Sequence, residues 1–388
     1  MNPYTQSTTI GVNARLLVPG RLEGLGWYTF EILRRLVTLR PKATWIFYFD
    51  RPFDPSFVFA DNVRGVVIHP PARHPILWHI WMAMNVPRAV RRDKCDVVLS
   101  LEGLMPLSCH VPSVDVIHDL GFVHEPSHLP WMVRAYYDYH FRRAAREATV
   151  LGTISEWSRA DVTQRYGRNP SEMFLVPNAI RDGFEPLEER EQDIVRAELT
   201  AGRRYFVHVG LLQPRKNIQR LMQAYDLYRK RGGNLSLVLA GRKGWALADM
   251  ERTFESLEFK HDIHFTGYVE DKRLQRIVAS AEALVFVPTY EGFGVPVIEA
   301  MACGIPVVAS RTSSIPEVAG SAAILVDPMS VLDIAQGMID VTSDPVLRKN
   351  LRERGLVRAK DFSWNRSAEI VNAMIDVALR SGQTSSQR

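Results

Sequence analysis

Short apolar runs rich in Val, Ile and Leu alternate along the chain with longer segments whose apolar positions recur every three to four residues. The runs predict strands and the longer segments predict helices, because a strand covered on both faces of a sheet needs apolar residues on both sides. In the first half, the predicted strands are residues 9–12, 45–49, 66–69, 97–100, 113–118 and 150–154. In the second half, they are residues 205–210, 235–240, 264–266, 283–288, 306–310 and 323–326. This order is typical of βαβ units, so we expect an α/β protein with two doubly wound, Rossmann-like domains.

The chain has 388 residues, which is enough for two domains of ordinary size. We place the first domain at residues 1–180 and the second at residues 201–363. Residues 181–200 begin with Gly and Pro and then become charge-dense, which is typical of a linker that runs into the first helix of a new domain. Residues 364–380 have helical periodicity, and we expect this helix to pack back on the first domain. Residues 381–388 are polar and are expected to form a flexible tail.

The net charge of +5 lies mostly in the first 180 residues, which have 20 Lys and Arg against 16 Asp and Glu. Such clusters attract anionic lipid headgroups or a phosphorylated acceptor, but solvated helix faces explain them equally well. Nucleic acid is not expected as a partner, because the cations are not part of a recognisable binding motif. The clusters are Arg88, Arg91, Arg92 and Lys94, and Arg142, Arg143 and Arg146.

Three cysteines, Cys95, Cys109 and Cys303, form no CxxC pair, which argues against a disulfide framework or a zinc site. The first residues lack a basic segment followed by a long apolar run, and no apolar stretch is long enough to cross a bilayer. We therefore expect a cytoplasmic protein, with peripheral contact to the inner face of the membrane as an open alternative.

The segment YEGFGVPVIEAMACGIPVVAS at residues 290–310 is the most informative one. It follows a predicted strand, turns through Gly292 and Gly294, and enters a predicted helix, whose N-terminus offers unpaired N–H groups to an anion such as phosphate. Glu291 and Glu299 bracket the loop, and their carboxylates can accept hydrogen bonds from sugar or ribose hydroxyls. Alternatively, Glu291 only complements the helix dipole and Glu299 is a surface residue.

A second segment, YFVHVGLLQPRKNIQRLMQAY at residues 205–225, is a predicted strand, a turn with Gly210 and a predicted helix. Arg215 and Lys216 lie just before the helix, where the helix dipole favours anions over cations. This local conflict indicates a ligand that supplies negative charge. Solvated surface cations are the alternative.

Two segments of the first half are weaker signals. Gly24 and Gly26 follow the first predicted strand and open a predicted helix at residues 28–39, but they do not complete a dinucleotide-binding fingerprint, which disfavours a dehydrogenase. His118 and Asp119 end a buried-looking strand, at the edge where open α/β sheets bind ligands. A single histidine is more often a packing residue.

Together these segments resemble the family 4 glycosyltransferases, which are retaining enzymes of the GT-B fold with two Rossmann-like domains facing a central cleft. The 290–310 string resembles the family's E-x7-E region, residues 210–217 its diphosphate-binding region, Gly24 and Gly26 its glycine loop, and His118 its cleft histidine. The shorter strings at residues 153–156, 176–178 and 265–269 also follow the family's order, although Ala179 replaces the usual Gly after Pro-Asn.

The resemblance implies that residues 1–180 form the acceptor-side domain and that residues 201–363 bind the nucleotide sugar. It also implies a role for each site residue. It places Glu291 beside the donor sugar, Glu299 on the nucleotide ribose, and Arg215 and Lys216 on the diphosphate. The implied catalytic residues are His118, Asp119, Glu291, Arg215 and Lys216. The implied donor-binding residues are Gly24, Gly26, Gly210, Arg215, Lys216, Val269, Asp271, Glu291, Gly292, Phe293, Gly294, Val295 and Glu299.

The implied activity is transfer of a hexose from a nucleotide-diphosphate sugar to a hydroxyl of a glycan or lipid-linked saccharide, in cell-surface polysaccharide synthesis. No Asp-x-Asp motif occurs, so no metal and no cofactor are expected, and the cations and helix N-termini must neutralise the diphosphate. A nucleotide-sugar epimerase or phosphorylase of the same fold and a catalytically silent binding subunit are the alternatives.

The favoured donor is GDP-mannose. Guanine presents an N1–H and a 2-amino group side by side, which a carboxylate can bind in bidentate fashion, and Glu270 and Asp271 follow the segment implied to bind the base. The opening segments also loosely resemble bacterial polysaccharide mannosyltransferases. Both carboxylates also suit the start of a helix, so UDP-glucose or another UDP-sugar is the alternative donor.

Overall fold

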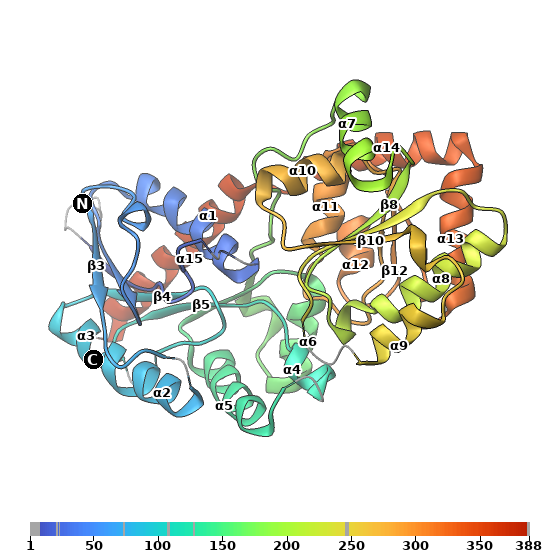
Figure 1. The fold of residues 1–388 in the computed structure, drawn as a ribbon. Coiled ribbons are helices and arrows are strands. Elements are labelled where there is room, and N and C mark those ends of the chain that lie inside the picture. Colours follow the sequence, from blue (N-terminus) through green and yellow to red (C-terminus); the bar gives the residue numbers. More distant parts are fainter. Residues whose placement is uncertain are drawn as a thin grey trace. The chain divides into compact units, whose positions relative to one another are not determined.

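The computed structural model describes residues 8–20, 22, 24–72, 74–106, 109–126, 129–244 and 248–385. The chain forms two compact units (Figure 1). The N-terminal unit comprises Met1–Asn178 and Trp364–Arg388, and the C-terminal unit comprises Ala179–Ser363. The chain passes from one unit to the other after Asn178, two residues before the end of the first predicted domain.

The N-terminal unit is built on a seven-stranded sheet in the order β3-β2-β1-β4-β5-β6-β7, in which all pairs are parallel. Six strands lie where the apolar runs predict them, although β3 begins three residues before its run. The seventh was missed, because it has only three residues, two of them partly exposed. The strands are β1 (Thr9–Asn13), β2 (Thr44–Phe49), β3 (Val63–Val67), β4 (Val97–Ser100), β5 (Ser113–Ile117), β6 (Val150–Thr153) and β7 (Met173–Leu175).

Helices cover both faces of this sheet. Apolar residues of α3, α5 and α6 pack on one face, in a core that includes Val90, Phe141 and Val162. On the other face α15 lies beside α1 and packs on β6, where Gly152 leaves room for Met374 (Figure 1). The helices are α1 (Gly24–Leu39), α2 (Pro75–Ile80), α3 (Val86–Arg92), α4 (Gly121–His124), α5 (Trp131–Glu147), α6 (Glu156–Tyr166) and α15 (Trp364–Ser385), with a π-helical turn at Trp81–Asn85.

The last helix is longer than its apolar pattern predicts, since α15 continues to Ser385. The prediction of a flexible tail from residue 381 is therefore wrong for residues 381–385, and residues 386–388 lie outside the described residues. Polar residues end an apolar pattern without ending a helix, and a single glycine weakens a helix by only about 1 kcal/mol. Gly382 also lies against Pro112, where a Cβ would come within 2.6 Å of the proline ring.

The C-terminal unit is built on a six-stranded sheet in the order β10-β9-β8-β11-β12-β13, in which all pairs are again parallel. Each strand lies within two residues of its predicted bounds. The strands are β8 (Tyr205–Val209), β9 (Ser236–Ala240), β10 (Ile263–Gly267), β11 (Ala283–Phe286), β12 (Val307–Ser310) and β13 (Ala323–Val326).

In this unit α8, α9 and α13 cover one face of the sheet, with a core that includes Tyr225, Met250 and Met338. The first helix, α7, lies inside the segment assigned to the linker, as expected of a linker that runs into a helix. The helices are α7 (Glu189–Thr200), α8 (Ile218–Lys230), α9 (Ala248–Ser256), α10 (Asp271–Ala279), α11 (Val295–Ala302), α12 (Ile315–Ala319), α13 (Val331–Ser343) and α14 (Pro345–Ala359).

Both sheets reverse their strand order next to their first strand. In the N-terminal unit β1 lies between β2 and β4, and in the C-terminal unit β8 lies between β9 and β11. Because the crossover helices leave β1 and β4, or β8 and β11, in opposite directions, the loops separate there and leave room at the carboxyl ends of the strands. Open α/β sheets bind ligands at such switch points.

Candidate functional site

At the switch point of the C-terminal unit, two loop backbones pack directly against each other. Gly210 follows β8 with φ +142°, and Gly241 follows β9 with φ +156°. A Cβ at Gly241 would lie 1.9 Å from the carbonyl oxygen of Gly210, so only glycine fits there. The predicted site residue Gly210 is thus held by a close backbone approach.

The two predicted cations follow in a short 3₁₀ turn, Pro214–Lys216, which precedes α8. Asn217 joins the turn to the helix with φ +60°, and its side-chain amide donates to the carbonyl oxygens of Val287 at 2.9 Å and Pro328 at 2.7 Å. These bonds tie the loop after β8 to the end of β11. Arg215 and Lys216 thus lie between β8 and α8, just before the helix, as the sequence predicts.

Both cations form ion pairs with Glu291. Lys216 Nζ lies 2.5 Å and Arg215 Nη1 lies 2.9 Å from Glu291 Oε1, and all three side chains are largely buried. Burial alone would raise the pKa of Glu291, but Arg215 and Lys216 lower it below its usual value. Glu291 therefore supplies one negative charge beside two cations, and the anionic ligand that the sequence indicates there stays a prediction.

The loop that carries Glu291 is fixed from the neighbouring strand. After β12, Ser314 donates through Oγ to the carbonyl oxygens of Glu291 at 2.9 Å and Phe293 at 3.0 Å. Gly294 has φ +105°, and a Cβ there would lie 2.4 Å from Ile315 Cδ1. The loop from Glu291 to Gly294 is buried and held by these contacts, and α11 begins at Val295.

Glu299 lies on α11 and is 2% exposed, so the alternative that it is a surface residue is wrong. Its partner is Arg181, whose Nε lies 2.7 Å from Glu299 Oε1 and whose Nη1 lies 2.5 Å from Asp271 Oδ1. Burial raises the pKa of Glu299, and Arg181 acts against this rise. Arg181 was missed because it lies in the predicted linker, where no local pattern marks it as a partner of a helix about 118 residues away.

The base-binding prediction concerns Val269 and Asp271. Val269 is partly exposed in the loop between β10 and α10, and Asp271 is the first residue of α10. Both the position at the helix N-terminus and the ion pair with Arg181 account for Asp271 without a base. Its role as a base-reading residue stays a prediction.

In the N-terminal unit, α1 begins at Gly24, four residues before the predicted start. Glycine has a low helix propensity, so the sequence predicts a helix that starts after Gly24 and Gly26. The first turn of a helix nevertheless tolerates glycine. Gly26 is tightly packed, because a Cβ there would lie 3.0 Å from the carbonyl oxygen of Leu16, so a larger residue would need a small shift of that loop.

His118 follows β5, and its ring packs edge-on against Tyr28 with centroids 4.4 Å apart. His118 Nε2 lies 2.9 Å from the carbonyl oxygen of Leu101, which can only accept, so Nε2 carries the proton and Nδ1 is the unprotonated nitrogen. Burial lowers the pKa of His118 to about 4, so the ring is neutral at pH 7. Asp119 accepts a hydrogen bond from the backbone N–H of Gly121 at 2.8 Å and so shapes the start of α4.

Within the described ranges, no group of three or more His, Cys, Asp and Glu side chains is placed to hold a metal ion. None of the described helices is long and apolar enough to cross a membrane. Several cations of the basic clusters pair with acidic neighbours: Arg92 with Asp93, Arg142 with Asp138, and Arg143 with Glu147.

Two family models together cover most of the chain. A model described as Glycosyltransferase Family 4 matches residues 22–183, and a model described as Glycosyl transferases group 1 matches residues 189–358. The chain belongs to these glycosyltransferases. The first model lies on the N-terminal unit with five residues beyond it, and the second lies within the C-terminal unit that carries the Lys216–Glu291 pair.

Among curated relatives, the O-antigen chain mannosyltransferase B of Escherichia coli is 28% identical over 365 residues, which are 91% of this chain and 96% of that protein. Among solved structures, sucrose-phosphate synthase from Thermosynechococcus elongatus has a TM-score of 0.73 and 18% identity, with 98% of each chain covered. HepE of Anabaena, solved with UDP and glucose, has a TM-score of 0.72 and 15% identity, with 96% of this chain and all of that chain covered. The fold of this glycosyltransferase is GT-B, as predicted.

A double-mutant cycle measures the contribution of the ion pair between Arg181 and Glu299 to stability. Arg181→Met leaves a nearly buried carboxylate without its guanidinium, so this variant and Glu299→Gln should each unfold at lower urea concentration than the wild type. The double variant should lose less than the sum of the two, with a coupling of about 1–3 kcal/mol. The matched cycle with Asp271→Asn should couple by only about 0–1 kcal/mol, because Asp271 is 44% exposed. Additive effects for Arg181 and Glu299 would contradict the pairing.

Two buried histidines make stability depend on pH. His208 and His140 are 0% and 1% exposed, and burial lowers their pKa to about 4 and about 3. As pH falls below 6.5, the unfolded chain binds protons that the native chain excludes, so the free energy of unfolding should fall between pH 6.5 and pH 4. His208→Phe should reduce this slope in urea unfolding measured across that range. A slope equal to that of the wild type would show that His208 does not contribute.

Proposed function

We propose that this glycosyltransferase moves mannose from GDP-mannose to a hydroxyl of a saccharide in cell-surface polysaccharide synthesis, with retention of anomeric configuration and without a metal. The observation that carries the proposal is the cluster at the switch point of the C-terminal unit. There, Arg215 and Lys216 meet Glu291 in front of the N-terminus of α11, and Arg181 holds Glu299 on the same helix.

The diphosphate binds to the positive groups of this cluster. Arg215 and Lys216 are held in place by Glu291 and by the Asn217 bonds, so they need little reorganisation when a phosphate arrives. The N-terminus of α11 carries the positive end of the helix dipole, which favours an anion, although Pro296 has no N–H and the N–H of Val297 donates to the carbonyl oxygen of Gly294 at 2.9 Å. Negative charge grows on the diphosphate as the bond to the sugar breaks, and these fixed positive groups stabilise it.

The two glutamates of the C-terminal unit take different roles. Glu291 stays ionised because of its two cations and accepts hydrogen bonds from sugar hydroxyls, as a positioning carboxylate and not as a nucleophile. Glu299 accepts from the ribose hydroxyls, and Arg181 opposes the effect of burial on its charge. The acceptor enters on the face of the sugar that the diphosphate leaves, and a phosphate oxygen takes its proton.

His118 serves the reaction as a neutral hydrogen-bonding group in the N-terminal unit. Its Nε2–H donates to the carbonyl oxygen of Leu101, which leaves Nδ1 to accept a hydrogen bond from a hydroxyl of the sugar or of the acceptor. Because burial keeps the pKa of His118 at about 4, this lone pair is present at every pH above that value.

Separate observations support the sugar and the base that we propose for the donor. Mannose is supported by the relative of Escherichia coli, a mannosyltransferase that matches nearly the whole chain. Guanine is supported by Asp271, since a carboxylate has lone pairs for both Arg181 and the paired donors of guanine. The HepE structure with UDP and glucose makes a UDP-sugar the second candidate donor.

The donor is tested by isothermal titration of GDP and UDP in buffer with EDTA. GDP should bind more tightly than UDP, and Asp271→Asn should bring the two dissociation constants to within about twofold, because an amide cannot accept both guanine donors. Glu258→Gln, which changes an exposed carboxylate of the same unit, is the matched control and should keep the preference. Tighter binding of UDP would move the donor to a UDP-sugar, and binding that appears only when Mg²⁺ replaces EDTA would overturn the metal-free mechanism.

A further inference from the structure

Four of the described residues other than glycine have a left-handed backbone, which residues with a side chain rarely adopt. Two of them, Lys94 and Ala201, are exposed and lie within two residues of the ends of α3 and α7, where helices commonly end in this conformation. The other two, Asn217 and Ser313, lie in the candidate site of the C-terminal unit. Backbone strain persists at functional sites when the surrounding structure fixes it.

Ser313 has no local reason for its φ of +55°. It lies between β12 and α12, so it does not end a helix, and serine is not among the residues that tolerate a left-handed backbone well. Asn217, by contrast, belongs to a residue type that is enriched in this conformation. Contacts made by Ser313 must therefore hold its backbone in place.

The hydroxyl of Ser313 acts both as a donor and as an acceptor. Its Oγ donates to the carbonyl oxygen of Thr312 at 2.7 Å and accepts from the backbone N–H of Glu291 at 3.1 Å. A glycine would adopt the same backbone without strain, but it has no group for either bond. The loop after β12 thus restrains the residue that forms ion pairs with Arg215 and Lys216.

Further hydrogen bonds connect this loop to the loop that carries the two cations. Thr312 Oγ1 donates to the carbonyl oxygen of Thr289 at 3.4 Å, and the backbone N–H of Thr289 donates to the carbonyl oxygen of Arg215 at 3.0 Å. Arg215 Nη1 in turn donates to the carbonyl oxygen of Tyr290 at 2.9 Å. The loops after β8, β11 and β12 therefore form one hydrogen-bonded network around Glu291.

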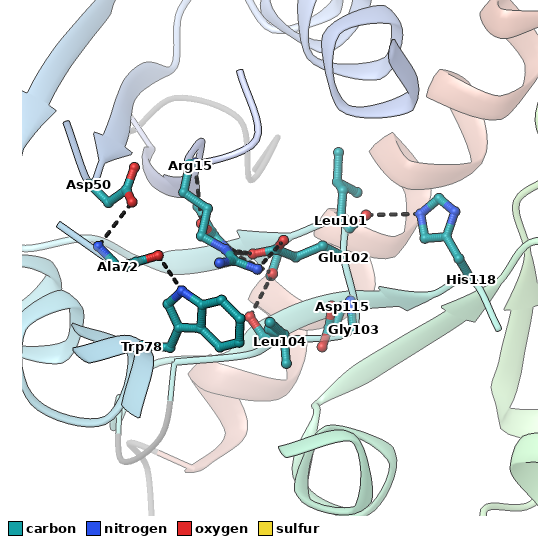
Figure 2. Close-up of polar contacts among 12 residues, drawn as sticks. Arg15, Asp50, Ala72, Trp78, Leu101, Glu102, Gly103, Leu104, Asp115 and His118 are labelled. Carbon is teal, nitrogen blue, oxygen red and sulfur yellow. Dashed lines mark hydrogen bonds and ion pairs between the residues drawn. The ribbon is translucent and has the colours of Figure 1, made fainter. Parts of the chain in front are cut away.

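The N-terminal unit holds a comparable ion pair without such strain. Arg15 follows β1 and Glu102 follows β4, and Arg15 Nε lies 2.6 Å from Glu102 Oε1 (Figure 2). The residue after Glu102 also has a left-handed backbone, with φ +75°, but it is a glycine, Gly103. Glycine thus stands where only the backbone conformation is required, whereas the strained position beside Glu291 has a side chain whose hydroxyl makes two bonds.

We propose that Ser313 is a positioning residue for Glu291, and that its strained backbone is retained because the hydroxyl is needed there. The hydroxyl holds the backbone of Glu291 so that the carboxylate faces both its cations and the sugar hydroxyls of the donor. This inference rests on the proposed function, since it concerns the carboxylate that positions the donor sugar. Because Ser313 acts through Glu291 while Asn217 still holds the loop of the cations, its loss should affect the sugar more than the nucleotide.

Two substitutions separate the hydroxyl from the backbone strain. Ser313→Gly removes both, whereas Ser313→Ala removes the hydroxyl and keeps the strain. Both should lower kcat/KM about tenfold for the donor that the wild type uses, GDP-mannose or a UDP-sugar, because a restraint on a positioning group is lost. Both should leave the Kd of the corresponding nucleotide within about twofold of the wild type. Ser313→Gly should nevertheless melt about 2–4 °C above Ser313→Ala, because only glycine relieves the backbone.

Ala201→Gly is the matched control, since Ala201 is an exposed residue of the same unit with φ +53°. This variant should melt above the wild type and keep the wild-type kcat/KM. Wild-type kcat/KM in Ser313→Gly would overturn the proposal, because it would show that only the backbone matters at this position. A loss of nucleotide binding as large as the loss of kcat/KM would also overturn it, because the damage would then extend beyond Glu291.

Hydrogen exchange measures the restraint without any substrate. Exchange of residues 290–294 should be faster in both Ser313 variants than in the wild type, and unchanged in Ala201→Gly. Equal exchange in all four proteins would contradict the restraint. If the wild type transfers no sugar from GDP-mannose or from a UDP-sugar, the proposed function fails, and the exchange measurement alone decides whether Ser313 holds Glu291.

Discussion

The buried contact between Lys216 and Glu291 is the constraint on which the C-terminal site depends. Removing Glu291 would leave the buried Lys216 without its carboxylate, whereas removing Lys216 leaves Glu291 paired with Arg215. The pair forms only if β8 and β11 are neighbours in the sheet and if the loops after both strands are held in place. Asn217 and Ser314 hold these loops through backbone carbonyl oxygens, and Gly294 lets the second loop turn into α11.

The same strand arrangement places charges at the edge of both sheets. In each unit a cation follows the first strand, a glutamate follows the fourth, and the two meet where the strand order reverses. The surroundings then distinguish the units. Arg215 adds a second cation beside Lys216 and Glu291, whereas in the N-terminal unit Arg15 lies beside Glu102 and the ring of Trp78.

The sequence predicted most of this fold, because strands buried on both faces appear as continuous apolar runs that are hard to mistake. It missed β7, which is too short to show a pattern, and it ended α15 too early, because a helix can continue through polar residues. In the candidate site, Arg215, Lys216, Glu291 and Glu299 were found because motifs mark them. Arg181 and the Arg15–Glu102 pair were not, because ion pairs between residues far apart in the chain leave no local periodicity.

In the proposed function Lys216 stabilises the departing diphosphate, and the most direct test measures the turnover of mannose transfer from GDP-mannose to a mannobiose acceptor. Lys216→Ala should lower kcat at least about 100-fold, as expected when one preorganised positive group is lost, while the chain stays folded. Lys349→Ala, which removes a cation that is 76% exposed on α14, is the matched control and should keep wild-type turnover. Wild-type turnover in Lys216→Ala would contradict the account.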